Sequence, residues 1–206
     1  MQNELAEFGF CVVAVALDEA AAAREWIEAA QPTYPCVIDP GHVVAERYGF
    51  INVPSVVWID EDDRIVRPPD ITPVNDLFKD FTGIESEHHH EALRAWVRDG
   101  VMPMTEQEVA ANQHLPTEAD ELARLHRRVA AHLHRAGNDD AAGIHFEAAR
   151  KLAPWDWTIH RGSMPLSGSD PFGQEFFSYV EAWGEAGAPG YSFGNAAMRR
   201  ERVTGD

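Results

Sequence analysis

The stretch Tyr34–Pro68, YPCVIDPGHVVAERYGFINVPSVVWIDEDDRIVRP, decides the fold. Its first apolar run is short and bounded by Pro, Asp and Gly, which is typical of a buried strand and predicts one over Cys36–Asp39. A helix is predicted over His42–Tyr48, and a turn follows at Val53 and Pro54. The order strand, helix, strand indicates an α/β fold.

The same stretch ends in a predicted β-hairpin. Its arms are Ser55–Ile59 and Arg64–Arg67, and the acidic turn Asp60–Asp63 joins them. Proline has no N–H for a sheet ladder, so Pro54 is expected at the beginning of its strand.

Upstream, the run Cys11–Leu17 is continuously apolar and predicts a strand buried on both faces, as parallel strands are. Before it, Glu4–Phe8 is typical of the end of a helix that stops at Gly9. After it, Asp18 is expected to cap a helix over Glu19–Ala30.

These segments resemble the second half of a thioredoxin-fold domain of the TlpA/ResA-like branch, which borders on the peroxiredoxins of the AhpC/TSA redoxin group. The residues that carry the resemblance are Ile38, Asp39, Ala45, Tyr48, Gly49, Val53, Pro54, Trp58, Ile59, Asp60, Arg64, Ile65 and Val66. The resemblance implies a cis peptide bond before the loop proline. It also implies a substrate-facing loop made of Asn52, Val53, Pro54 and Ser55.

In that family a Cys-x-x-Cys or related motif ends the central strand, and a thiolate at the following helix N-terminus attacks a disulfide or peroxide. The chain has two cysteines, Cys11 and Cys36, and neither is followed two residues later by another. The family pattern places the motif before Met1. We therefore expect no catalytic residue among these 206, and a chain truncated at its N-terminus. A ResA-like selenoprotein would give this result if its selenocysteine codon were read as a stop.

The absent motif has a structural consequence, because the strand that carries it lies at the centre of the thioredoxin sheet. Without it, the strands Cys11–Leu17 and Ser55–Ile59 would present two facing rows of unpaired backbone groups. The predicted fold is thus α/β, a thioredoxin-like sheet that lacks its first strand.

The two cysteines are not expected to form a disulfide. If both strands end at equivalent aspartates, Asp18 and Asp39, then Cys11 and Cys36 lie about four residues out of register, beyond the reach of an S–S bond. Both are expected to be small buried apolar residues.

After the hairpin the sequence predicts a proline-rich connector, Pro68–Pro73, a short helix over Leu77–Phe81 and a helix over Ser86–Arg98 with one apolar face. The last would close a thioredoxin-like domain of residues 1–104. Pro103–Pro116 is predicted to be a linker.

Residues 105–190 are predicted to form an α-helical region, and 191–206 a flexible tail. Helices over Thr117–Ala136 and Asp140–Leu152 resemble one tetratricopeptide repeat, and a further helix is expected over Phe172–Trp183. The matching residues are Ala130, Leu133, Gly137, Ala142, Phe146, Ala149 and Pro154. His126 stands where the repeat often has Trp.

The first of these helices has an apolar side, made of Leu122, Leu125, Val129 and Leu133. A lone repeat normally cannot bury its own apolar face. We expect it to pack on neighbouring helices, on a protein partner or on another copy of the chain.

Two patterns raise metal hypotheses that the sequence disfavours. His88, His89 and His90 point in three directions on a helix, so a solvated helix start is the better interpretation. Histidines 126, 132, 134, 145 and 160 are scattered, and neither HExxH nor a paired CxxC is present. No metal and no cofactor are expected, and the acidic turn at Asp60–Asp63 is interpreted as solvated.

The chain has 206 residues, a formal charge of −17 and a sequence pI of about 4.9. Nucleic acid and anionic membrane surfaces need a positive field, so neither is an expected partner. The sequence begins with no signal-peptide pattern and has no run of the ~20 apolar residues that cross a bilayer, which predicts a cytoplasmic location.

Two functions follow as hypotheses. The first is a thiol- or selenol-dependent oxidoreductase that takes a disulfide or peroxide and a thiol electron donor, with its nucleophile outside these residues. The second is a redox-dead thioredoxin-like scaffold that recruits a protein through its helical half.

Overall fold

The computed structural model describes residues 1–71, 76, 85–113 and 115–187. The described chain divides into two compact units. The first unit comprises Met1–Val44 and Pro54–Gln113; the second, which we call the helical unit, comprises Ala45–Val53 and the described part of His114–Ser192. The boundary predicted after residue 104 remains a prediction from the sequence.

The first unit begins with the short helix α1 (Gln2–Leu5) and the 3-10 turn η1 (Ala6–Phe8), which Gly9 ends in the left-handed conformation at φ 82°. Strand β1 (Ala14–Ala16) then pairs in parallel with β2 (Cys36–Ile38). Both strands exist as predicted, but β1 is shorter than the run Cys11–Leu17.

The prediction that β1 is buried on both faces is wrong, since all three of its residues are only half-buried. Among the described residues β1 pairs with β2 alone, which leaves its other edge without a ladder. Helix α2 (Ala20–Ala30) follows, and its N-cap is Glu19 without a side-chain bond, so the cap predicted at Asp18 is also wrong.

The predicted hairpin is confirmed as β3 (Ser55–Ile59) and β4 (Ile65–Ile71), paired antiparallel. In its turn the Asp60 carboxylate accepts hydrogen bonds from the backbone N–H groups of Asp62 and Arg64, at 3.0 and 2.9 Å. Short side-chain bonds of this kind are why acidic residues are frequent in tight turns.

The connector predicted to begin at Pro68 is a strand instead, because β4 continues through both prolines. The pairing shifts between Val56 and Trp58, whose partners are Asp70 and Arg67. Pro68 and Pro69 thus lie at an irregularity of the ladder, where a missing N–H costs little.

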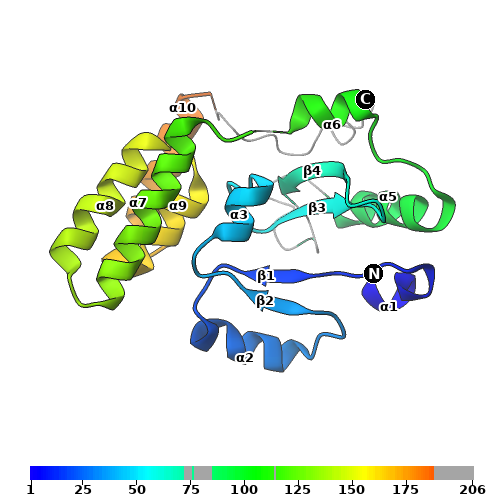
Figure 1. Ribbon diagram of the computed structural model, residues 1–206, viewed down its shortest axis with the longest axis horizontal. Helices are drawn as coiled ribbons and strands as arrows, with labels where there is room; N and C mark the ends of the chain where they lie inside the picture. The colour runs from blue at the N-terminus through cyan, green and yellow to red at the C-terminus, as the bar shows by residue number, and fades with distance from the viewer. Residues whose placement is uncertain (72–75, 77–84, 114, 188–206) are drawn as a thin grey trace. The chain divides into compact units, whose positions relative to one another are not determined.

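The four strands found among the described residues form two separate two-stranded sheets rather than one continuous sheet (Figure 1). Around the hairpin, the core of the first unit gathers Leu5, Trp58, Val66 and Leu93. The last comes from helix α5 (Ser86–Asp99), which ends at left-handed Gly100. The mixed α/β class is confirmed.

A helix replaces the predicted linker after α5. Helix α6 (Glu106–Asn112) starts at a capping box in which Thr105 accepts from the N–H of Glu108 while the Glu108 carboxylate accepts from the N–H of Thr105. The pattern Thr-x-x-Glu is a local signal for such a start. The helix predicted over Leu77–Phe81 lies outside the described residues.

The helical unit holds most of α3 (Val43–Tyr48), and its other helices are α7 (Glu118–Arg135), α8 (Asp139–Leu152), α9 (Trp157–Ser163), the 3-10 turn η3 (Pro165–Ser167) and α10 (Gln174–Glu185). Helices α7 and α8 lie side by side as an antiparallel hairpin (Figure 1). Two small cores join them, one of Ala123, Ala149, Ala153 and Ile159, the other of Ala130, Ala142 and Phe146.

Helix α7 buries its alanine and arginine side, and its leucine side is exposed. Ala123, Arg124 and Arg127 are buried, whereas Leu122 and Leu125 are 45% and 51% exposed. Small alanines allow the two helices to approach closely, which explains this choice of face. The helical hairpin is confirmed; the likeness to a tetratricopeptide repeat remains a prediction. No helix among the described residues is long and apolar enough to cross a membrane.

Candidate functional site

The loop predicted to face substrate lies directly before β3. Val53 and Pro54 are exposed, and Asn52 and Ser55 are half-buried. Pro54 immediately precedes Ser55, the first residue of the strand, which agrees with the position that a proline requires. The cis peptide bond and the role in substrate binding stay predictions.

The segment that leads into this loop is fixed first by its own sequence. The Asp39 carboxylate accepts from the N–H groups of Val43 and Val44, at 2.8 and 2.7 Å, and so begins α3. Gly49 adopts φ 71° after the helix, and the N–H of Phe50 donates to the Ala45 carbonyl at 2.8 Å. A left-handed residue that ends a helix is usually glycine, so the Tyr-Gly pair of the sequence marks a helix end.

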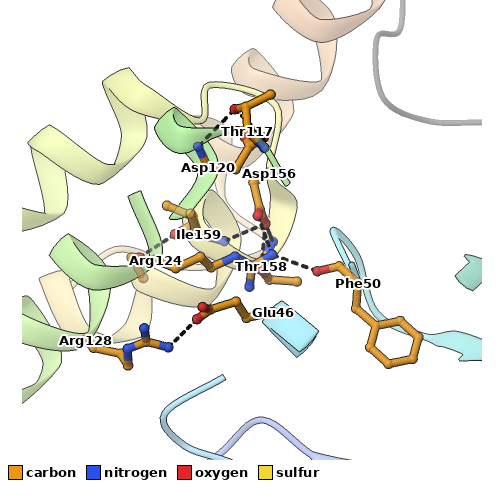
Figure 2. Close-up of polar contacts among 10 residues, drawn as sticks. Glu46, Phe50, Thr117, Asp120, Arg124, Arg128, Asp156, Thr158 and Ile159 are labelled. Carbon is orange, nitrogen blue, oxygen red and sulfur yellow. Dashed lines mark hydrogen bonds and ion pairs between the residues drawn. The ribbon is translucent and has the colours of Figure 1, made fainter. Parts of the chain in front are cut away.

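Beyond Gly49, helices α7 and α9 hold the backbone of the segment (Figure 2). Arg124 Nη2 donates to the Phe50 carbonyl at 2.8 Å and to Asp156 Oδ2 at 2.5 Å. The N–H of Thr158 lies 3.3 Å from the Ile51 carbonyl and 2.9 Å from Asp156 Oδ1. Two successive carbonyls before the loop therefore have donors from the helical unit.

A second contact joins α7 to the same segment, one helical turn further along α7, and this one is an ion pair. Arg128 Nη1 bonds to Glu46 Oε2 on α3, and both side chains are half-buried (Figure 2). Arg124 and Arg128 are four residues apart and thus lie on one face of α7. That face contacts the segment Ala45–Val53 at a helix and at a loop carbonyl.

Asp156 has a second role as the N-cap of α9. Its Oδ1 accepts from the Thr158 N–H and hydroxyl and from the Ile159 N–H. Burial raises the pKa of the Asp156 carboxyl, while Arg124 and these hydrogen bonds oppose that shift. A buried carboxylate needs such partners, so the arginine and the helix start depend on each other.

Sequence reasoning missed this network. Asp156 followed two residues later by Thr158 is a cap pattern that could have revealed the start of α9. Arg124 carries no local signal, because its acceptor at Phe50 is 74 residues away in the chain.

The first unit contains a separate buried polar cluster. Arg67 of β4 lies 3.1 Å from His89 Nδ1 and 3.9 Å from Asp70, with its guanidinium 4.9 Å from the centre of the Trp58 ring. Burial, and then the charge of Arg67, lower the pKa of His89 to about 3. The ring is thus neutral at pH 7, and its Nδ1 accepts from Arg67.

His89 corrects the interpretation of the three histidines as a solvated helix start, since it is only 5% exposed. His88 is exposed and His90 half-buried, so consecutive residues do point in different directions. No group of three potential metal ligands occurs among the described residues.

The two cysteines are free, as predicted, but the expectation that both are buried is wrong, because Cys11 is exposed and Cys36 is only half-buried. It precedes β1, whereas Cys36 pairs with Ala14, so the two are out of register. The acidic turn is largely exposed, in line with its interpretation as a solvated loop.

Residues 1–67, about a third of the chain, match the family model described as AhpC/TSA family. The match supports assigning this part of the chain to the thioredoxin-like redoxins, which exchange thiols and disulfides with their partners. Comparison with curated proteins found no match, and neither did comparison with solved structures.

Proposed function

We propose that this protein is a redoxin that reduces disulfides or peroxides, in which Asn52–Ser55 form the substrate-facing loop and a thiol or selenol outside residues 1–206 is the nucleophile. The observation that carries the proposal is the family match, which spans residues 1–67 and so contains the whole loop and most of the hairpin. The finer likeness to TlpA and ResA rests on the sequence resemblance.

The separate sheets support a nucleophile on a strand between them. Among the described strands, β1 pairs only with β2, and β3 only with β4, so each sheet keeps an open edge. Unpaired edges invite another strand. A central strand there would bring a reactive residue at its end to the loop that precedes β3.

Neither cysteine of the chain suits that role. The Cys11 thiol donates to the neighbouring Val12 carbonyl at 3.4 Å, and Cys36 lies within β2, with its sulfur 3.8 Å from the Tyr34 carbonyl. Neither cysteine lies at the N-terminus of a helix, the position that favours a thiolate.

In the proposed reaction the thiolate or selenolate attacks one sulfur of a substrate disulfide. The S–S bond breaks, the departing thiolate takes a proton, and a donor thiol then resolves the mixed disulfide. With a peroxide, the O–O bond breaks, the departing oxygen leaves as an alcohol or water, and the nucleophile becomes a sulfenic or selenenic acid. One donor thiol then condenses with this acid to a mixed disulfide or selenenyl sulfide and releases water, and a second donor thiol frees the nucleophile, so external thiols are required.

The experiment compares the 206-residue protein with an N-terminally longer protein translated from the upstream reading frame. We expect dithiothreitol-dependent disulfide or peroxide reduction only in the longer protein, carried by a Trp-x-x-Cys or selenocysteine motif. Reduction by the shorter protein that survives Cys11→Ser and Cys36→Ser together would contradict the proposal.

A second function has one observation in its favour. Leu122, Leu125 and Val129 form an apolar side of α7 that is 43% to 51% exposed, which suits a protein partner or a second copy of the chain. In this alternative the redoxin-like part is a redox-dead scaffold. An upstream frame without any Cys or selenocysteine codon near a Trp would favour it.

A further inference from the structure

We infer that Arg124 is a positioning residue for the substrate-facing loop and that it acts through the Phe50 carbonyl. The inference rests on the proposed function for the meaning of the loop. It assigns to the helical unit a part in substrate binding, rather than the separate recruiting role of the scaffold hypothesis.

One nitrogen of Arg124, Nη2, makes both of the contacts that matter. Arg124 Nη2 has two N–H groups, and its two acceptors are the Phe50 carbonyl at 2.8 Å and Asp156 Oδ2 at 2.5 Å. The Arg124 side chain is only 6% exposed. A charged donor in such a site makes a stronger bond than a neutral one.

A second helix acts on the next carbonyl. The N–H of Thr158, in the first turn of α9, lies 3.3 Å from the Ile51 carbonyl. Asp156 orients both donors, because its two oxygens bind Arg124 and the start of α9. The carbonyls of two consecutive residues, Phe50 and Ile51, are thus held immediately before Asn52 and Val53.

The two held carbonyls set where the loop begins. Each peptide group is planar, so holding two in succession fixes the rotations of Ile51 between them and the direction in which the chain enters Asn52. A loop ordered before substrate arrives loses less entropy when substrate binds. Arg124 therefore acts on substrate affinity and not on the reacting atoms.

If Arg124 only stabilised the fold, its ion pair with Asp156 would be enough, and its hydrogen bond to the Phe50 carbonyl would have no part in its role. Buried ion pairs contribute little net stability over apolar residues of the same volume. The double variant R124M/D156N separates the two roles. It removes both charges together, and the asparagine that replaces Asp156 still offers an oxygen to the N–H groups of Thr158 and Ile159.

The first measurement uses the 206-residue protein and needs no redox activity. Nitrogen-15 relaxation of Asn52 and Val53 should give order parameters of about 0.85 in the parent and less than about 0.6 in R124M/D156N, with the midpoint of thermal unfolding changed by only a few degrees. Arg150→Met is the matched control, because Arg150 is a half-buried arginine of α8 that donates to Ser167 at 3.3 Å. Its order parameters in the loop should match the parent.

Unchanged loop dynamics in R124M/D156N would overturn the inference. Dynamics raised equally in α7, α8 and the loop would overturn it as well, since that result indicates a general loss of structure. If Arg150→Met loosened the loop to the same extent, that result would also overturn the inference.

The second measurement uses the longer, redox-competent protein. R124M/D156N should raise KM for a disulfide substrate about tenfold, while kcat and the rate of alkylation of the nucleophile stay within about twofold of the parent. A lower kcat with an unchanged KM would contradict a positioning role. If the longer protein reduces nothing but the loop of the shorter protein loosens as expected, the proposed function fails and the loop contact stands.

Discussion

Arg67 of the first unit and Arg124 of the helical unit are both buried, and they are held in different ways. Arg67 lies among aromatic rings, with neutral His89 as acceptor and the Asp70 carboxylate 3.9 Å away. Arg124 of the helical unit has a carboxylate at 2.5 Å and a backbone carbonyl at 2.8 Å.

The two sites differ in which group has its pKa shifted by burial. Burial lowers the pKa of Arg67, and Asp70 only partly opposes the shift. At the site of Arg124, burial raises the pKa of its partner, the Asp156 carboxyl. Removing Arg67 loses its ring contacts and a long ion pair, whereas removing Arg124 leaves the Asp156 carboxylate buried without the cation that it binds at 2.5 Å.

The largest expected effect is therefore on the helical unit. Arg124→Ala should lower its free energy of unfolding by about 3–5 kcal/mol, because Asp156 then remains buried without its cation. Urea unfolding followed by circular dichroism measures this change. R124M/D156N, which removes both charges, should lose far less, and an equal loss in the two variants would contradict the charge argument.

Acid should act on the first unit through His89. Its pKa in the folded protein, about 3, lies below the ordinary 6.5, so the unfolded chain binds the extra proton and stability falls as pH drops below about 6.5. The expected loss is about 1.4 kcal/mol per pH unit, or about 2 kcal/mol by pH 5. Urea titrations between pH 7 and about pH 5 test it.

His89→Gln is the matched variant for that experiment. Glutamine offers an acceptor to Arg67 but has no charge to gain, so this component of the pH dependence should vanish. The pKa of His160 in the helical unit, lowered to about 4 by burial and Arg150, predicts a parallel loss there that His89→Gln leaves intact. An unchanged acid response of α5 in this variant, followed by hydrogen exchange, would contradict the assignment to His89.

Arg67→Met is expected to cost less than Arg124→Ala. Methionine keeps much of the side-chain volume against Trp58. The loss comprises the cation–π contact, the bond to His89 and the long ion pair with buried Asp70, together about 2–3 kcal/mol. Chemical unfolding of the two variants side by side gives the comparison. A cost for Arg67→Met that equals or exceeds that of Arg124→Ala would reverse the contrast between the sites.

The smallest effects concern two exposed capping boxes, one in each unit. Thr105→Ala and Thr117→Ala each remove a hydroxyl that accepts a backbone N–H at 3.2 Å. Each should cost about 1 kcal/mol, with the same value in the two units because both sites are exposed. Serine at either position should restore the loss.

Local patterns predicted the elements that surround the candidate loop. The hairpin turn at Asp60, the helix end at Gly49 and the proline before β3 all depend on bonds or conformations within a few residues. The same local reasoning could have found α6 through its Thr-x-x-Glu start. It failed for β4, because whether a strand continues through two prolines depends on the irregular pairing with β3.

The sequence by itself thus determined the redoxin-like order of strand, helix and hairpin, and the position of the loop at Val53 and Pro54. Only the tertiary structure decided which charged groups are buried and what they hold. Arg124 meets Phe50 across 74 residues and Arg67 meets His89 across 22. Local sequence reports the conformations open to neighbouring residues, whereas the partner of a buried charge depends on which distant segments pack around it.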